Sequence, residues 1–211
     1  LFRLLPSSVF YLLFAILYGL FPMPSFPSIL AATGNPHKLA EIRAILAPCG
    51  FRILGAADVG GIPAVVEDGL TFADNAARKA TTVAAALRRP AFADDSGLEV
   101  RALAGRPGVF SARYAGEGAG DRANLDKLLA EMRDAADRTA RFVCVIAVAD
   151  AAGRLAGTVS GEVRGRLIEA PRGVNGFGYD PVFVPDGFEQ TFAELPAEVK
   201  NRLSHRGQAL A

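Results

Sequence analysis

We expect an α/β fold, because short apolar strand patterns and amphipathic helix patterns alternate along the 211 residues of the chain. A strand pattern at 28–33 runs through a tight turn into a helix pattern at 37–46. Farther on, two strand patterns at 141–150 and 155–166 are separated by a short Gly-containing turn and predict an antiparallel hairpin. With 51% apolar residues the chain can bury the core of one domain or of two closely joined lobes.

Residues that cap or end helices predict the remaining elements in the first half of the chain. Asn35 is a good N-cap and Pro36 suits a first helical position, so the first helix should begin just after them. A second strand is expected at 51–55, and Thr71 should begin a longer helix that ends before Pro90.

Two adjacent carboxylates follow the next strand pattern. Because Ser96 and Gly97 favour a turn, we expect this strand to end at Asp94 and Asp95. Side chains alternate between the two faces of a strand, so only one carboxylate should face a ligand directly. We expect it to be Asp95, with Asp94 in support.

The second half should carry the long loops. A Gly- and Pro-rich loop at 104–120 precedes a helix that we expect Asp121 to cap. A second Gly-rich loop at 171–181 follows the hairpin, then a short strand at 182–184 and a final helix from Pro196. Long loops of this kind usually carry function.

Charge and cysteine content exclude several classes of protein. There are 23 basic and 22 acidic residues, a net charge of +1, so no global field recruits nucleic acid or a membrane surface. Cys49 and Cys144 are far apart and have apolar neighbours, which favours reduced core thiols and a reducing, cytoplasmic location. His37 and His205 cannot form a zinc site with these cysteines.

Residues 1–22 differ from the rest of the chain. Their apolar run is shorter than the roughly 20 residues that span a bilayer, and no small-residue cleavage site follows it. Since Met23 stands just before the first expected strand, we interpret residues 1–22 as an upstream translation artefact and residues 23–211 as a single domain. A membrane anchor is the alternative.

Two polar sets could bind a phosphate chain and a metal. The turn at 33–38 offers helix N-terminal amides and the charge of Lys38, although a well-capped structural turn is the alternative and the P-loop pattern is absent. The second set consists of carboxylates that would repel one another unless a hard divalent cation, most naturally Mg²⁺, neutralised them. It contains Glu67, Asp68, Asp94 and Asp95. A plain turn cap is the alternative for one of these Asp residues.

Two further sets could bind a nucleoside. In the stretch 176–181, Phe177 or Tyr179 could stack on a base beside glycines that allow close approach, or they could be core aromatics in a turn. A basic cluster near the C-terminus is either a clamp for an anion or a solvated face. It contains Lys200, Ser204, His205 and Arg206. Together the four sets describe a metal-dependent nucleotide site.

Six ordered motifs resemble the inosine/xanthosine triphosphate pyrophosphatases, the Ham1-type non-standard purine NTP pyrophosphatases. They are TGNPHK (33–38), EDGLTFADNAARKA (67–80), ADDSGLEVRALAGRPGVFSARYAG (93–116), GFGYDP (176–181), TFAEL (191–195) and KNRLSHRGQAL (200–210). The resemblance implies an α/β fold with a long mixed central sheet, flanking helices and two lobes around a nucleotide cleft. It further implies Mg²⁺-dependent hydrolysis of XTP, dITP and ITP to the monophosphate and pyrophosphate by a homodimer that cleanses the nucleotide pool.

The resemblance also assigns site residues. It makes Asp95 the general base, and Asp95 with Glu67 the metal ligands. The substrate-binding residues that it implies are Thr33, Gly34, Asn35, Pro36, His37, Lys38, Ser96, Phe177, Gly178, Tyr179, Asp180, Lys200, His205 and Arg206. Donors to the purine C6 oxygen, such as backbone N–H groups or Arg206, would disfavour ATP.

Some points stay open at this stage. Val66 stands where relatives often have another acidic residue, so the second metal ligand could be Glu67, Asp68 or Asp94. A pyrophosphatase of modified pyrimidine nucleotides and a nucleotide-binding regulatory protein attached to a membrane are the rival hypotheses.

Overall fold

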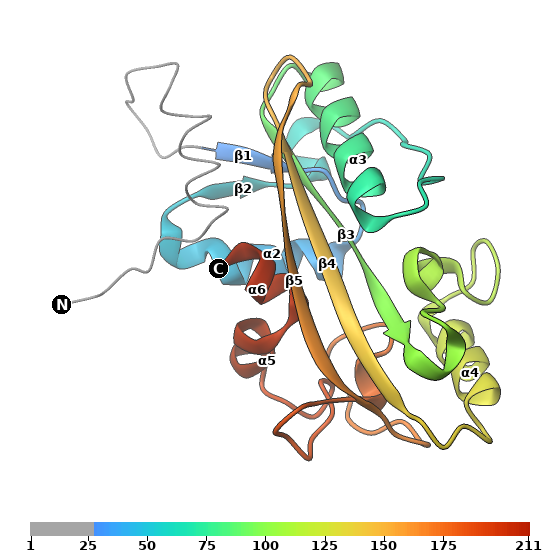
Figure 1. Ribbon diagram of the computed structural model, residues 1–211. Helices are drawn as coiled ribbons and strands as arrows, with labels where there is room; N and C mark the ends of the chain where they lie inside the picture. Colours follow the sequence, from blue (N-terminus) through green and yellow to red (C-terminus); the bar gives the residue numbers. More distant parts are fainter. Residues whose placement is uncertain (1–27) are drawn as a thin grey trace. The chain divides into compact units, whose positions relative to one another are not determined.

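The computed structural model describes residues 28–211, and the expectations for residues 1–22 and Met23 lie outside them. Figure 1 shows a sheet with helices packed beside it. The sheet has six strands in the order β2-β1-β3-β4-β5-β6. Its strands are β1 (Ser28–Ala31), β2 (Arg52–Leu54), β3 (Ala91–Val100), β4 (Thr139–Ala149), β5 (Leu155–Leu167) and β6 (Phe183–Pro185). The α-helices are α2 (Pro36–Leu46), α3 (Phe72–Leu87), α4 (Asp121–Glu131), α5 (Ala197–Leu203) and α6 (His205–Leu210).

The sheet is mixed, as expected. Strand β1 pairs in parallel with both β2 and β3, whereas β5 pairs antiparallel with β6. Strands β4 and β5 are neighbours joined only by residues 150–154, and a connection that short can join only antiparallel strands. The predicted hairpin and the α/β class are therefore confirmed.

The described chain divides into two compact units, which we call the first and second unit. The first contains residues 28–95, 145–161 and 206–211, and the second contains residues 96–144 and 162–205. The dividing points fall inside β3, β4, β5 and α6.

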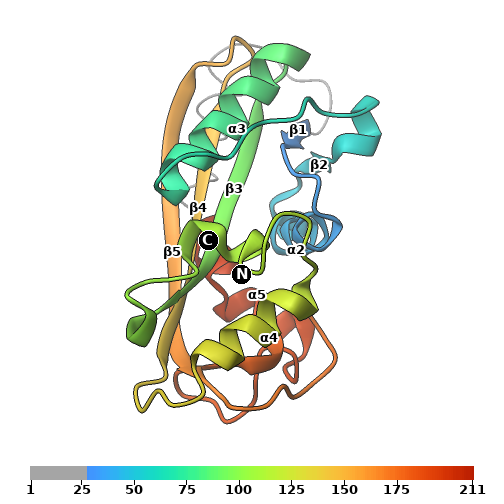
Figure 2. The ribbon, with the colours of Figure 1, turned by 90° about the vertical axis from the view of Figure 1, so that its right-hand side faces the viewer.

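Each unit has its own hydrophobic core. In the first unit small side chains of α3 pack on the sheet, so that this helix lies close along the strands, as Figure 2 shows for β3. They include Ala76, Ala80 and Ala84. The second unit buries aromatic side chains instead, among them Phe183 and Phe192 with ring centroids 5.1 Å apart. Close packing of this kind supplies most of the stabilisation of both units.

The predicted helix starts are confirmed at two positions and wrong at a third. The Asn35 side chain accepts hydrogen bonds from the amides of His37 and Lys38, and Thr71 accepts one from the amide of Asp74. At α4 the N-cap is Gly120 rather than Asp121, which is the first helical residue. The carboxylate of Asp121 is engaged elsewhere.

Two other predictions were wrong. Strand β3 does not end at the carboxylates but continues through Asp94, Asp95, Ser96 and Gly97 to Val100. It pairs with β1 only at Ala91 and Phe92, so its other neighbour, β4, supports it beyond that point. The expected single C-terminal helix is two short helices, because Ser204 has an extended backbone between α5 and α6.

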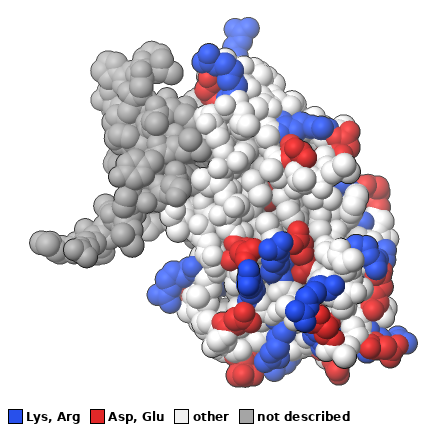
Figure 3. All heavy atoms as spheres, viewed as in Figure 1, with Lys and Arg blue, Asp and Glu red and all other residues white. Residues whose placement is uncertain are grey.

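The surface and the cysteines agree with the composition. Basic and acidic side chains are interspersed on the face shown in Figure 3. Among residues 28–211 no helix is long and apolar enough to cross a membrane. Neither cysteine forms a disulfide; Cys144 is buried as expected, whereas Cys49 is half-buried.

Candidate active site

The two carboxylates in the middle of β3 contact different sets of residues in the first unit. Asp94 and Asp95 are 2% and 7% exposed, so both are removed from bulk water. Alternation along the strand sends one side chain toward α2 and α6 and the other toward α3. We describe these as the Asp94 cluster and the Asp95 cluster.

The Asp94 cluster joins a strand to two helices. Asp94 Oδ2 lies 3.0 Å from Lys38 Nζ and 2.9 Å from an Arg206 guanidinium nitrogen. Arg206 is itself 1% exposed and also pairs with Glu41. Burial alone would raise the pKa of Asp94, but the two cations outweigh it and hold the pKa far below its usual range. Asp94 is therefore a permanent anion between two cations.

In the Asp95 cluster the surroundings raise the pKa of the carboxylate rather than lower it. The amide nitrogen of Asn75 donates to Asp95 Oδ2 over 3.1 Å, and Lys79 Nζ lies 3.3 Å from Asp95 Oδ1 and 2.9 Å from Glu67 Oε2. Burial raises the pKa of Asp95 and the nearby charge of Glu67 adds to this rise, although Lys79 opposes it. Asp95 is thus the carboxylate of the pair that accepts a proton more readily.

Lys79 links two carboxylates that would otherwise repel each other. Burial would lower the pKa of its ammonium group, but the charges of Asp95, Asp94 and Glu67 raise it, so Lys79 stays charged. Asn75 extends the same link, since its side-chain oxygen accepts a hydrogen bond from the amide of Gly69. The loop that carries Glu67 is thereby tied to α3 and β3.

The donor set suits Mg²⁺ better than zinc. Within residues 28–211 no group of three or more His, Cys, Asp and Glu side chains could hold a metal. Glu67 and Asp95 nevertheless face one shared cation, and a protein commonly supplies only one or two carboxylates to Mg²⁺ while substrate phosphates supply further oxygens. Asp68 pairs instead with Arg78 on the surface.

The turn at 33–38 uses several of its amides internally. The amide of Asn35 donates to Thr33 Oγ1, and the amides of His37 and Lys38 donate to the Asn35 side chain. A phosphate at this helix N-terminus would compete with Asn35 for those amides. The ammonium group of Lys38, which is held beside Asp94, is the charged donor of the turn.

The predicted aromatic loop at 176–181 lies in the second unit and is tightly fastened. The amide of Phe177 donates to Asp180 Oδ2 over 2.8 Å, and Lys200 forms a buried ion pair with the same carboxylate. Lys200 Nζ also lies 5.1 Å from the centre of the Phe177 ring. Tyr179 is buried and donates to the carbonyl of Ser111.

The remaining predicted residues are placed as follows. His205 is buried and stacks on Phe142, with ring centroids 4.8 Å apart. Ser96 is half-buried and directly follows Asp95 in β3. Arg206 uses both terminal nitrogens for carboxylates, so it serves as a buried structural cation in this conformation.

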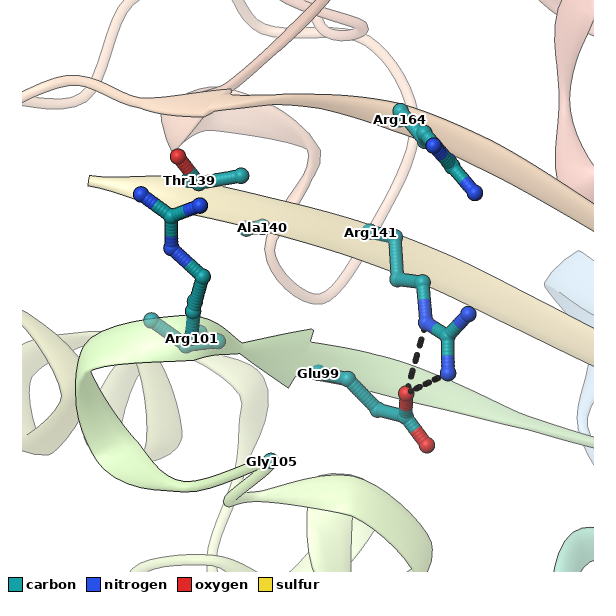
Figure 4. Close-up of a pocket in the computed structure, with 8 residues that line it drawn as sticks. Glu99, Arg101, Gly105, Thr139, Ala140, Arg141 and Arg164 are labelled. Atoms are coloured by element: carbon teal, nitrogen blue, oxygen red, sulfur yellow. Dashed lines mark hydrogen bonds and ion pairs between the residues drawn. The ribbon is translucent and has the colours of Figure 1, made fainter. Parts of the chain in front are cut away.

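A separate groove of about 350 Å³ in the second unit contains none of the predicted residues. Figure 4 shows that its wall carries Glu99 and Arg141, which form an ion pair, with Arg101 and Arg164 nearby. Arg101 and Arg164 pair with Asp137 and Glu162. Since these charges neutralise one another, the groove offers no net charge for an ionic ligand.

Comparison with known proteins decides the family. The sequence profile of the Ham1 family matches residues 29–211, which is almost the whole described chain. The chain belongs to the Ham1 family. Two bacterial relatives, each named dITP/XTP pyrophosphatase, are 50% identical to it over 185 residues. The alignment covers 88% of this chain and 82% of the protein of Desulfotalea psychrophila, and 87% and 92% for Geobacter sulfurreducens.

Solved Ham1 structures agree with the fold. The HAM1 protein of Coxiella burnetii has 40% identity and a TM-score of 0.78, with 88% of this chain and 95% of that chain covered. The Ham1 protein of Staphylococcus aureus has 40% identity and a TM-score of 0.75, with coverages of 86% and 93%.

In this Ham1 chain, sequence reasoning missed two residues that contact Asp95. Asn75 and Lys79 lie one helical turn apart on α3, and this spacing was visible in the sequence. What the sequence did not reveal is that this face of α3 meets β3 at Asp95. An Asn and a Lys on an otherwise apolar helix face were the available signal.

Gly176 gives a test of the aromatic loop. It has φ +74°, and a Cβ there would overlap the carboxylate of Asp180. We expect Gly176→Ala to lower the melting temperature by about 5–10 °C, since it adds a clash to the roughly 1–2 kcal/mol cost of the left-handed conformation. Gly187→Ala is the matched control, because Gly187 has φ +83° with nothing within 4 Å of its Cβ position. Equal shifts in the two variants would contradict the tight packing around Asp180.

Proposed function

We propose that the protein hydrolyses the non-standard purine nucleoside triphosphates dITP, XTP and ITP to the monophosphate and pyrophosphate. The observation that carries this proposal is the Asp95 cluster, a buried carboxylate with a raised pKa beside Lys79 and Glu67. It lies in a Ham1-family chain that is 50% identical to proteins named dITP/XTP pyrophosphatase. Removal of such triphosphates keeps them out of the nucleotide pool.

The products define the bond that breaks. Release of pyrophosphate and a monophosphate requires the α,β bridge to break. In the proposed step, a water oxygen bonds to the α-phosphorus while the bond from this phosphorus to the α,β-bridging oxygen breaks. Asp95 accepts the proton of that water, and its raised pKa favours this transfer. Lys79 and Lys38 are the cationic side chains that stabilise charge developing on the phosphates.

Glu67 and Asp95 are the residues that would hold Mg²⁺. Both carboxylates already share one cationic neighbour, Lys79, so they can share a divalent ion as well. When bound, Mg²⁺ neutralises the pyrophosphate leaving group and polarises the attacked phosphate. Lys79 keeps the two carboxylates close together.

The triphosphate end of the substrate is assigned to the first unit. Thr33, Gly34, Asn35, Pro36, His37 and Lys38 form the turn that binds the phosphate chain. Asp94 holds Lys38 in place, which fixes the position of the ammonium group without consuming the carboxylate of Asp95.

The nucleoside end is assigned mainly to the second unit. Phe177 supplies a stacking surface, and its neighbours Gly178, Tyr179 and Asp180 fix the shape of the loop that carries it. Ser96, Lys200, His205 and Arg206 complete the proposed set. Residues 23–211 thus act as one pyrophosphatase domain.

The assembly and location follow the same proposal. We infer a homodimer, as the resemblance to the Ham1-type pyrophosphatases implies. A cytoplasmic location without a nucleic acid or membrane partner is supported by the near-neutral charge and the cysteines without a disulfide. Size-exclusion chromatography with light scattering would measure the assembly directly.

The proposed reaction is tested by pyrophosphate release from XTP, dITP, ITP, ATP and GTP at equal concentrations. We expect rates on the first three to exceed those on ATP and GTP by at least about 100-fold. The amino group of adenine would leave donors to the C6 oxygen unpaired, whereas rejection of guanine, which keeps this oxygen, must come from its 2-amino group. Excess EDTA should abolish release, and MgCl₂ should restore it. Release of orthophosphate instead, or equal rates on all five nucleotides, would refute the proposal.

A further inference from the structure

We propose that Asp121 is a positioning residue for the nucleoside end, because its carboxylate fixes the peptide between Phe177 and Gly178. This inference rests on the proposed function and adds a residue to it. The contact joins positions 57 residues apart: the amide of Gly178 donates to Asp121 Oδ2 over 2.7 Å. Hydrogen bonds to an ionised acceptor are roughly twice as strong as neutral ones.

Asp121 is free to make this contact because it does not cap its own helix. The N-cap position of α4 belongs to Gly120, and no side chain caps the helix there. As the first helical residue, Asp121 is also at a position where the positive end of the helix dipole favours a carboxylate.

The helix that carries Asp121 is well anchored. Leu125 and Leu128 of α4 are buried in the core of the second unit. Asn124 accepts a hydrogen bond from the amide of Ala115 and donates one to the carbonyl of Ala112, over 2.8 and 3.1 Å. A carboxylate on such an element is held in position before any ligand arrives.

The far side of the aromatic loop is held independently of Asp121. Tyr179 and Asp180 are buried, and they are fastened by Ser111 and Lys200 respectively. Gly178 has φ +60° and is only half-buried. Loss of Asp121 should therefore loosen the peptide at Gly178 while the rest of the loop stays folded.

A less ordered peptide at Gly178 should weaken nucleotide binding without changing the rate of the chemical step. Phe177 is the proposed stacking surface, and it precedes the peptide that Asp121 holds. If the binding-competent conformation is populated only one tenth of the time, the apparent dissociation constant rises tenfold. The reacting groups around Asp95 are not part of this contact, so the maximal rate should stay the same.

The experiment compares Asp121→Ala, Asp121→Asn and Asp126→Ala with the unmutated full chain in Mg²⁺. We expect Asp121→Ala to raise KM for dITP and XTP about 5- to 10-fold and to change kcat less than twofold. Asp121→Asn keeps an acceptor oxygen and should bring KM back to within about threefold of the unmutated value. Asp126 lies on the same helix and pairs with Arg122 in solvent, so Asp126→Ala controls for loss of charge on α4.

Amide hydrogen exchange supplies a second readout that does not depend on turnover. Peptides that contain Gly178 should exchange at least about tenfold faster in Asp121→Ala and unchanged in Asp126→Ala. Unchanged KM in Asp121→Ala, with or without a change in exchange, or equal KM changes in all three variants, would overturn the role of Asp121. An unmutated protein without pyrophosphate release would overturn the proposed function, whereas an active Asp121→Ala variant with normal KM refutes Asp121 alone.

Discussion

Asp95→Asn is expected to slow pyrophosphate release from XTP and dITP by about 10³- to 10⁴-fold. The substitution keeps the size of the side chain but removes the proton acceptor, and general base catalysis typically contributes 10²- to 10⁴-fold. It also removes a carboxylate that faces Lys79 and the proposed metal, which places the loss at the upper end of that range. Initial rates at saturating nucleotide and Mg²⁺ give the measurement.

Asp68→Asn is the matched control for this variant. Asp68 follows Glu67 in the same acidic loop, but its side chain is 65% exposed and pairs with Arg78. Its substitution should change the rate less than about twofold. If Asp68→Asn inactivates the protein while Asp95→Asn leaves more than about a tenth of the rate, the catalytic carboxylate has been assigned to the wrong residue.

The sequence predicted those features of the fold that depend on residues close together in the chain. Asn35 and Thr71 cap the helices that follow them, as their side-chain chemistry predicts. The hairpin of β4 and β5 also follows from a short connection between two alternating patterns. Such features depend on neighbouring residues, so the sequence contains the needed information.

Long-range pairing limited the rest of the prediction. Asp94 to Gly97 have the residue types of a turn, yet β3 continues through them, because hydrogen bonding to the neighbouring strand β4 outweighs turn preference. Asp121 was expected to cap α4 because capping is a local preference of this residue type. Its carboxylate instead accepts a hydrogen bond from Gly178, far along the chain. No local pattern reports a partner at that distance.

The sequence indicated which residues to consider for the candidate site, but it did not indicate which of them contact one another. The carboxylates, the lysine of the turn and the aromatic loop were all singled out, but the partition into separate Asp94 and Asp95 clusters required the three-dimensional structure. Lys79 shows why: its place on α3 follows from the sequence, but only the position of β3 makes it the link between Glu67 and Asp95. A buried polar network is defined by its geometry, not by its composition.

Asp94→Asn is expected to destabilise the folded protein by about 3 kcal/mol. The variant leaves Lys38 and Arg206 without the carboxylate between them, and removal of one partner from a buried ion pair typically costs roughly 3–5 kcal/mol. The lower end applies because Arg206 keeps its contact with Glu41. For a chain of 211 residues this corresponds to a melting temperature about 6–12 °C lower.

Asp68→Asn serves again as the control, since its ion pair with Arg78 is exposed and should shift the melting temperature by less than about 2 °C. Loss of stability in Asp94→Asn must also be separated from loss of catalysis. At a temperature where the variant is fully folded, Lys38 should still bind phosphate less well, because its ammonium group has lost the partner that positions it. A variant with unchanged melting temperature and unchanged KM would mean that Lys38 and Arg206 keep their positions without Asp94, and that the adjacent pair of carboxylates in β3 has a single functional member.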